Sequence, residues 1–90
     1  LYQDLVFLDV ASRLAKFLLS ASVEGADSVP GQRQLDVQLS QYELGTMVNA
    51  SRESVNKQLR EWEERGIVDV KKGKITLLNL ASLQQKAEGL

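Results

Sequence analysis

The chain has 90 residues, which fits one small domain, and 43% of them are hydrophobic, an ordinary fraction for a globular core. It contains neither Cys nor His, which excludes disulfides, thiolate or imidazole metal sites, and a thiolate nucleophile or histidine base. The net charge of −1 argues mildly against nucleic-acid binding, and no apolar run approaches the ~20 residues of a membrane span.

The start of the chain lacks the charged-then-apolar pattern of a secretory signal peptide. It also lacks a Met, so we expect a piece of a longer protein. The absence of Cys fits a cytoplasmic location.

The first part of the chain predicts helix. Among the first eight residues, Leu1, Leu5 and Leu8 recur at helical spacing, as at the end of an apolar helix that needs a partner. Asp9 can cap a second helix over about 10–22, whose apolar residues also repeat at helical intervals.

The next segment predicts a loop and then a strand. Residues 22–34 (SVEGADSVPGQRQ) contain two Gly, the only Pro and several short polar residues, which favour a loop. Residues 34–39 (QLDVQL) alternate Leu35, Val37 and Leu39 with polar neighbours, which predicts a short half-buried strand.

A pair of helices joined by a short turn follows. Ser40 and Glu43 form a capping box for a helix through Val48. Gly45 costs helix stability, so we interpret it as a point of close helix approach. Asn49 tolerates the left-handed conformation that a tight turn requires.

Ser51 can cap the second helix, which is predicted to run to about Arg65 and to stop at Gly66. The two helices predict a helix-turn-helix over about 40–65, which directs the start of the second helix toward a DNA major groove. One face of that helix is apolar (Val55, Leu59 and Trp62), and the other is polar (Arg52, Glu53, Asn56, Lys57 and Arg60).

A β-hairpin is predicted directly after the second helix. Its strands cover 67–70 and 75–78, the turn lies at 72–73, and Asn79 can cap a final short helix. We expect a mainly α fold with a small β-hairpin wing over about 67–78. This fold class is a winged helix-turn-helix with a three-helix core and a short antiparallel sheet, occupying residues 9–90.

Basic residues gather in the helix-turn-helix and the wing despite the acidic total. Residues 52–74 hold seven of the eleven Lys and Arg residues and five acids. This span is therefore locally basic, and the distribution of charge matters more for nucleic-acid binding than the sum.

At these positions the chain resembles the DNA-binding domain of the CRP/FNR family of bacterial transcription regulators. The matching stretches are FLDVASRLAKFLL (7–19), LSQYELGTMVNASRESVNKQLREWEERGIV (39–68) and VKKGKITLLNLASL (70–83), and SRESVNKQL is the most specific. Asn49 stands where this family usually has Gly, and Lys57 where Arg is common.

The resemblance implies sequence-specific binding of double-stranded DNA by a homodimer at a pseudo-palindromic operator. It assigns base reading to Arg52, Glu53 and Lys57. It assigns dimerisation to Leu1, Leu5 and Leu8, because residues 1–8 match the end of the family's long dimerisation helix or the linker. It assigns phosphate contacts to a larger set of polar residues, namely Ser40, Tyr42, Ser51, Ser54, Lys71, Lys72 and Lys74.

The residue types fit these assignments. Arg can donate two hydrogen bonds to guanine, and Glu can accept one from cytosine. Lys57 lies four residues after Glu53, so both fall on one helix face. The family's sensory domain, which would bind a cyclic nucleotide or another effector, has no counterpart here, and no cofactor is expected in this chain. Contact with RNA polymerase is a further implication of the resemblance.

Plainer interpretations stand beside each assignment. The polar face of the second helix could be an ordinary solvated side, and Ser40 and Ser51 could be helix caps alone. Tyr42 and the wing lysines could be simple surface residues, and Trp62 could be core or a stacking platform. Two of the three glutamates at the end of the second helix could form a carboxylate pair, or all three could be a solvated face, namely Glu61, Glu63 and Glu64.

Two other functions compete with DNA binding. Winged helices also serve as protein–protein interaction modules, and the net acidity of this chain favours that alternative. An enzyme has no positive support, because the sequence offers no clustered nucleophile and base, no phosphate loop and no metal motif.

Overall fold

A computed structural model describes residues 2–23, 32–35, 40–71 and 74–89, with side chains described from residue 10 onward. It has four helices and a small antiparallel sheet, which confirms the predicted winged helix-turn-helix class. The elements in chain order are α1 (Tyr2–Ala21), β1 (Ser22–Val23), β2 (Arg33–Leu35), α2 (Gln41–Val48), α3 (Arg52–Glu64), β3 (Val68–Lys71), β4 (Lys74–Leu77) and α4 (Leu80–Ala87).

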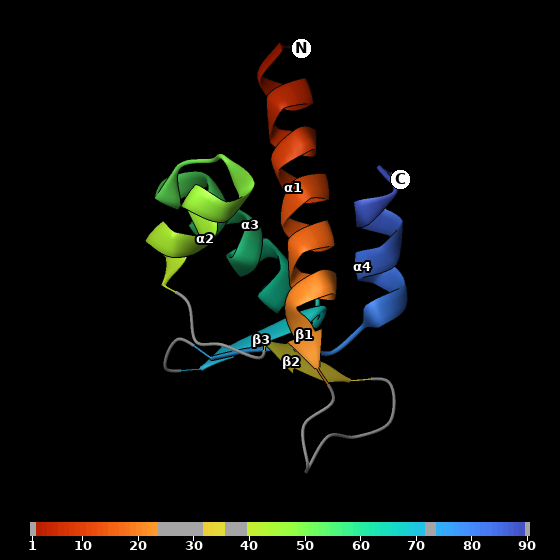
Figure 1. Cartoon of the computed structure of the whole chain (residues 1–90). Helices are drawn as coiled ribbons and strands as arrows, with labels where there is room; N and C mark the ends of the chain where they lie inside the picture. The colour runs from red at the N-terminus through yellow and green to blue at the C-terminus, as the bar shows by residue number, and fades with distance from the viewer. Residues whose placement is uncertain (1, 24–31, 36–39, 72–73, 90) are drawn as a thin grey trace.

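Helix α1 is the axis of the fold. Figure 1 shows α4 along one flank of α1, the α2–α3 pair along the other, and the sheet across its C-terminal end. The strand order is β1-β2-β4-β3, so β4 pairs with both β2 and β3. The β3–β4 hairpin is the predicted wing, and it is the next element in the chain after α3.

One hydrophobic core joins all of these layers. Trp62 is 1% exposed and is the largest fully buried side chain, so it belongs to the core and is not a stacking platform. Burying a side chain of this size contributes several kcal/mol, since truncating one to Ala typically costs about 3–5 kcal/mol. The core comprises Ala11, Leu14, Ala15, Leu18, Leu35, Leu44, Val48, Val55, Leu59, Trp62, Ile67, Val68, Ile75, Leu77 and Leu83.

The helix cap predicted at Asp9 is wrong. Helix α1 is continuous from Tyr2 to Ala21, so Asp9 lies inside it. The apolar spacing of the first eight residues and that of 10–21 therefore belong to one helix, and a single Asp inside a long run of helix formers does not end it. No described helix, α1 included, is long and apolar enough to cross a membrane.

The sheet is larger than the predicted hairpin. The predicted loop contains β1 and the start of β2, whose residues pair as Ser22 with Leu35 and Val23 with Gln34. Arg33 stabilises this corner, because its Nε donates a 2.8 Å hydrogen bond to the Oγ of the buried Ser22. The predicted strand at 34–39 is confirmed at Gln34 and Leu35, and its remaining residues lie outside the described part of the chain.

The turn between α2 and α3 depends on Gly45 and Asn49. Asn49 has φ 57° and ψ 51°, the left-handed conformation that the sequence predicted. The Ala50 N–H donates a 2.8 Å hydrogen bond back to the carbonyl of Gly45. A methyl group at Gly45 would lie 2.6 Å from the carbonyl oxygen of Ala50. Gly45 is therefore a point of close approach, but the backbone of the turn approaches it, and not another helix as the sequence predicted.

Helix α3 ends as predicted at Gly66. This residue has φ 72°, a conformation that Gly adopts without steric cost. Its N–H donates to the Glu63 carbonyl at 3.1 Å, and the Ile67 N–H donates to the Trp62 carbonyl at 2.8 Å. These two bonds form a Schellman motif, which returns the chain toward the core as β3 begins.

We predict that Gly45→Ala lowers the free energy of unfolding by about 2 kcal/mol, because the new methyl group forces the turn backbone to move. This loss occurs although Ala favours helix by about 1 kcal/mol over Gly. Urea denaturation measures it, with the exposed neighbour Thr46→Ala as a control that stays within about 0.5 kcal/mol. A Gly45→Ala variant as stable as the parent chain would contradict the close packing of the turn.

Candidate nucleic-acid interface

Helix α3 begins at a capped and solvent-exposed end. The Ser51 Oγ accepts a 3.1 Å hydrogen bond from the Ser54 N–H and donates to the Ser54 Oγ at 3.0 Å. Capping at Ser51 is therefore confirmed, and Ser54 is half-buried against it. Both hydroxyls lie where the positive end of the helix dipole favours an anion.

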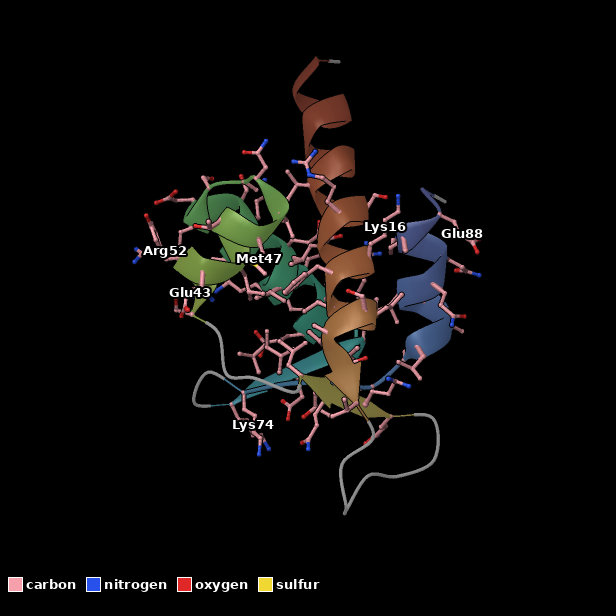
Figure 2. All side chains as sticks on the ribbon, viewed as in Figure 1. Lys16, Glu43, Met47, Arg52, Lys74 and Glu88 are labelled. Carbon is pink, nitrogen blue, oxygen red and sulfur yellow. The ribbon has the colours of Figure 1, made fainter. Side chains whose placement is uncertain are left out.

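The three residues assigned to base reading form one exposed surface, which we call the reading face (Arg52, Glu53 and Lys57). All three side chains are exposed on the first two turns of α3. The opposite side of the same turns carries Val55, which is fully buried. Figure 2 shows Arg52 at the outer edge of the α2–α3 pair, on the side of the molecule opposite α4. The amphipathic pattern thus fixes the reading face toward solvent.

The two halves of α3, counted with its C-cap Arg65, carry opposite net charge. Residues 52–60 carry three basic side chains against one acid, and residues 61–65 carry three acids against one base. Arg65 is also engaged, because its Nη2 lies 3.1 Å from Glu61 Oε1. The N-terminal half therefore attracts an anion and the C-terminal half repels it, which favours the solvated-face interpretation of the glutamates.

The start of α2 lies beside the start of α3. The Ser40 Oγ accepts a 3.1 Å bond from the Glu43 N–H, and Glu43 Oε1 accepts a 3.1 Å bond from the Ser40 N–H. This is the predicted capping box. Tyr42 is 71% exposed, so its ring is a surface group.

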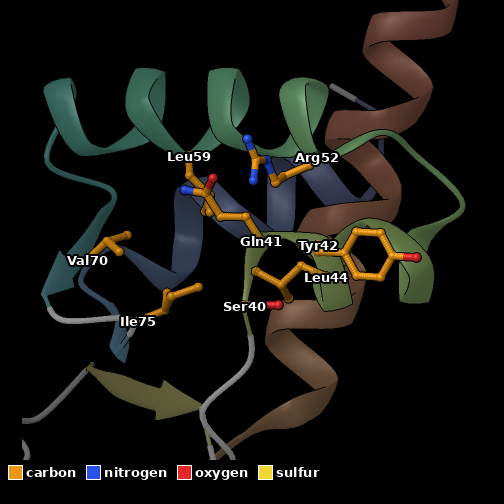
Figure 3. A pocket seen from close by; sticks show the side chains of 8 residues that line it. All are labelled: Ser40, Gln41, Tyr42, Leu44, Arg52, Leu59, Val70 and Ile75. Carbon is orange, nitrogen blue, oxygen red and sulfur yellow. The ribbon is translucent and has the colours of Figure 1, made fainter.

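A groove connects the starts of α2 and α3 with the wing. Its volume is about 360 Å³. It brings together three of the predicted site residues, Ser40, Tyr42 and Arg52. Figure 3 shows Arg52 reaching from α3 toward Gln41, whereas the Tyr42 hydroxyl points away from the groove. The apolar lining comes from both helices and from the two wing strands, with Leu44, Leu59, Val70 and Ile75.

Lys57 lies in a second depression, farther along α3. It shares this depression of about 310 Å³ with Asn56 and Arg60 and with two acids, Glu61 and Glu64. The Gln41 Nε2 donates a 2.9 Å hydrogen bond to the Asn56 Oδ1, which ties the start of α2 to the polar side of α3. This bond was not predicted, because neither residue belongs to a recognisable local motif.

The described wing lysines lie at the tip of the β3–β4 hairpin. Lys71 pairs with Lys74 in the strand register, and both are exposed. Lys71 also lies 3.7 Å from Asp69, which reduces its local charge. Lys72 and Leu1 lie outside the described residues. Leu5 and Leu8 are within α1, but their side chains are not described, so the predicted dimer contact stays a prediction.

Sequence reasoning also missed an arginine contact at the turn. Arg13 of α1 is half-buried, and its Nε donates a 2.7 Å hydrogen bond to the Val48 carbonyl. Its Nη2 donates a 3.3 Å bond to the Asn49 carbonyl. The only sequence signal is a basic residue next to the apolar stripe of α1, which is too common to predict a partner.

Two helices joined by a tight turn, with a β-hairpin that packs against the second helix, define a winged helix-turn-helix. A sequence model of the Crp-like helix-turn-helix domain matches residues 12–86. The chain therefore belongs to the Crp-like helix-turn-helix domain family.

Individual relatives agree with this assignment. The chain is 37% identical over 68 residues to the cAMP-activated global transcriptional regulator Vfr of Pseudomonas aeruginosa, covering 76% of this chain and 31% of Vfr. It is 37% identical over 76 residues to a CRP-like cAMP-activated global transcriptional regulator of Mycobacterium tuberculosis, covering 84% of this chain and 34% of the relative. The chain thus spans about a third of the length of these relatives.

A solved structure supports the fold. The catabolite activator protein of Thermus thermophilus matches 99% of this chain and 38% of its own, with a TM-score of 0.75 and 26% identity. Family and relatives support the predicted class of DNA-binding transcription regulation, and they do not favour the protein-docking alternative. These relatives are named as transcription regulators, which agrees with the expectation that this chain is not an enzyme.

We predict that Ser40→Ala lowers the free energy of unfolding by about 1 kcal/mol, because the capping box loses its acceptor for the Glu43 N–H. Ser40→Thr keeps a hydroxyl and should lose less. The matched control is Ser20→Ala, an exposed serine that bonds only within α1, to the Phe17 carbonyl. Equal stability of the Ser40→Ala and Ser20→Ala variants in urea would contradict a capping role for Ser40.

Proposed function

We propose that this domain reads a specific sequence of double-stranded DNA by inserting the start of α3 into the major groove. The observation that carries the proposal is the exposed, locally basic reading face, fixed on a buried apolar stripe within a Crp-like domain. Residues 9–90 would be the DNA-binding unit, and residues 1–8 would be the end of a dimerisation helix or linker.

The reading face supplies the chemistry for two kinds of base contact. The Arg52 guanidinium can donate two hydrogen bonds to guanine O6 and N7, and the Glu53 carboxylate can accept from cytosine N4. Lys57 is one helical turn farther along and would add a basic contact. As an ammonium it gives up the two-pronged geometry of Arg, so it would discriminate less sharply between bases.

Phosphate contacts would surround the reading face. Ser40 and Tyr42 come from the start of α2, Ser51 and Ser54 from the start of α3, and Lys71, Lys72 and Lys74 from the wing. A serine cap uses an oxygen lone pair, so the Ser40 hydroxyl can donate to a phosphate while it caps α2. Such contacts fix the register of the domain on the duplex and carry no sequence information themselves.

The complete regulator would act as a homodimer in the bacterial cytoplasm. Leu1, Leu5 and Leu8 would lie in its dimer contact, and two reading helices would meet half-sites of a pseudo-palindrome roughly 34–36 Å apart. Because two relatives are named as cAMP-activated, we propose that the remainder of the protein binds a cyclic nucleotide or another effector. RNA polymerase would be a further partner at promoters.

Selection of random duplex DNA by the full-length protein, at two salt concentrations and with candidate effectors, tests the function. We expect an enriched pseudo-palindrome whose binding weakens with salt, because phosphate contacts release counterions. No enrichment under any condition would overturn specific DNA reading.

On the selected duplex, Arg52→Ala should weaken binding by about 1–3 kcal/mol and relax the preference at one base position of each half-site. The control is Arg65→Ala, which removes an exposed arginine of the same helix at its far end, where Glu61 pairs with it. Fluorescence anisotropy with base-substituted duplexes measures both variants. Equal losses for Arg52→Ala and Arg65→Ala would show that Arg52 contributes only general charge.

A further inference from the structure

We propose that Arg13 of α1 is a positioning residue for DNA reading, which acts by holding the turn between α2 and α3. The inference rests on the proposed DNA-binding function and adds a residue that lies outside the reading face. Arg13 is 39 positions before Arg52 in the chain, and α1 contributes no residue to the proposed DNA contacts.

The contact joins one side chain to two consecutive carbonyls. Arg13 Nε lies 2.7 Å from the Val48 oxygen, and Arg13 Nη2 lies 3.3 Å from the Asn49 oxygen. Val48 is the last residue of α2, and Asn49 is its left-handed C-terminal cap. The last carbonyls of a helix have no partner within it and carry the negative end of its dipole, so a guanidinium there is favourable.

Backbone bonds and Arg13 serve different carbonyls at the end of α2. The Gly45 and Thr46 carbonyls accept bonds from the backbone of the turn, from Ala50 and Asn49 respectively. Beyond Met47, the carbonyls of Val48 and Asn49 accept the bonds from Arg13. A planar guanidinium presents several N–H groups in a fixed fork, which can serve two neighbouring oxygens at once, whereas an ammonium is a single point of charge.

The same turn determines where the reading face lies. Asn49 is followed by Ala50, whose carbonyl packs at Gly45, then by the cap Ser51 and by Arg52. Because this packing leaves no room for an added methyl group, the turn transmits any displacement of Asn49 directly to the first turn of α3. Base-edge hydrogen bonds need distances near 3 Å, so a small displacement weakens them while phosphate contacts adjust.

If the Arg13 contact only stabilised the fold, its loss would have a different effect. An Arg13 variant would then have a lower melting temperature, but its folded population would keep the same preference among duplexes. A positioning contact instead reduces the ratio of specific to non-specific affinity in protein that is still folded. The decisive quantity is therefore this ratio, measured well below the melting temperature of every variant.

The experiment compares Arg13→Lys and Arg13→Met with Ser12→Ala in the full-length protein. Arg13→Lys keeps the charge and loses the fork, and Arg13→Met also removes the charge. Ser12→Ala is the matched control, since Ser12 is the neighbouring residue and its Oγ donates 3.1 Å to the Ala87 carbonyl of α4, away from the turn. Dissociation constants are measured for the selected duplex and for a scrambled one at a single salt concentration.

We expect Arg13→Lys to weaken binding to the selected duplex about tenfold, with scrambled-duplex affinity unchanged within about twofold. Arg13→Met should lose at least as much specific affinity, and Ser12→Ala should match the parent protein. A specificity ratio for Arg13→Lys and Arg13→Met within about twofold of the parent value would overturn the positioning role, whatever happens to stability.

Hydrogen exchange without DNA separates this inference from the proposed function. In the Arg13 variants, amide exchange should accelerate in peptides covering 46–52 and stay unchanged in peptides covering 80–88. Unchanged exchange in both peptides would overturn the contact itself. A parent protein with no duplex preference would overturn the proposed function, and the exchange result would still report whether Arg13 holds the turn.

Discussion

The close packing of the Ala50 carbonyl against Gly45 is the constraint on which the remaining geometry depends. It allows the chain to leave α2 and begin α3 within three residues. A longer connection would separate the two helices and remove the shared core contact of Leu44, Val48 and Val55. The start of α3 would then no longer be fixed relative to the start of α2, where Ser40 and Tyr42 lie.

Two kinds of interaction, apolar packing and hydrogen bonds at the helix ends, fix the position of the reading face relative to this turn. The apolar stripe of α3, ending in the buried Trp62, fixes the rotation of the helix about its axis and turns Arg52, Glu53 and Lys57 outward. Hydrogen bonds at the ends of the helices then fix where each helix begins. The caps leave oxygen and N–H groups at the two helix starts, which are the places where phosphate would approach.

Local signals explain why much of the fold could be predicted from the sequence. The Ser40–Glu43 box, the left-handed Asn49 and the terminating Gly66 each act over a few residues, so their physics is visible in a short stretch. The sheet was underestimated because β1 and β2 have only two and three residues. They pair with each other, and β2 is stabilised by pairing with β4 from far along the chain. The prediction of a helix cap at Asp9 was wrong because the apolar repeat of α1 continues on both sides of this residue.

The candidate site also has features that the sequence predicts and contacts that it does not. Its exposed and capped residues follow from helix periodicity, and their DNA roles follow from the family resemblance. The bonds from Arg13 to the turn and from Gln41 to Asn56 join residues 15 to 36 positions apart. No pattern of residue types indicates such contacts, because many surface arginines and glutamines would satisfy the same pattern with water as the partner.

The most direct test of the account is a hydrogen-exchange footprint of the full-length protein on its selected duplex. We predict that DNA slows exchange at residues 40–43 and 51–57, where the two helix starts meet the backbone and the bases, and leaves α4 at 80–87 unchanged. Protection confined to α4 or to surfaces away from the start of α3 would contradict the claim that this helix reads DNA.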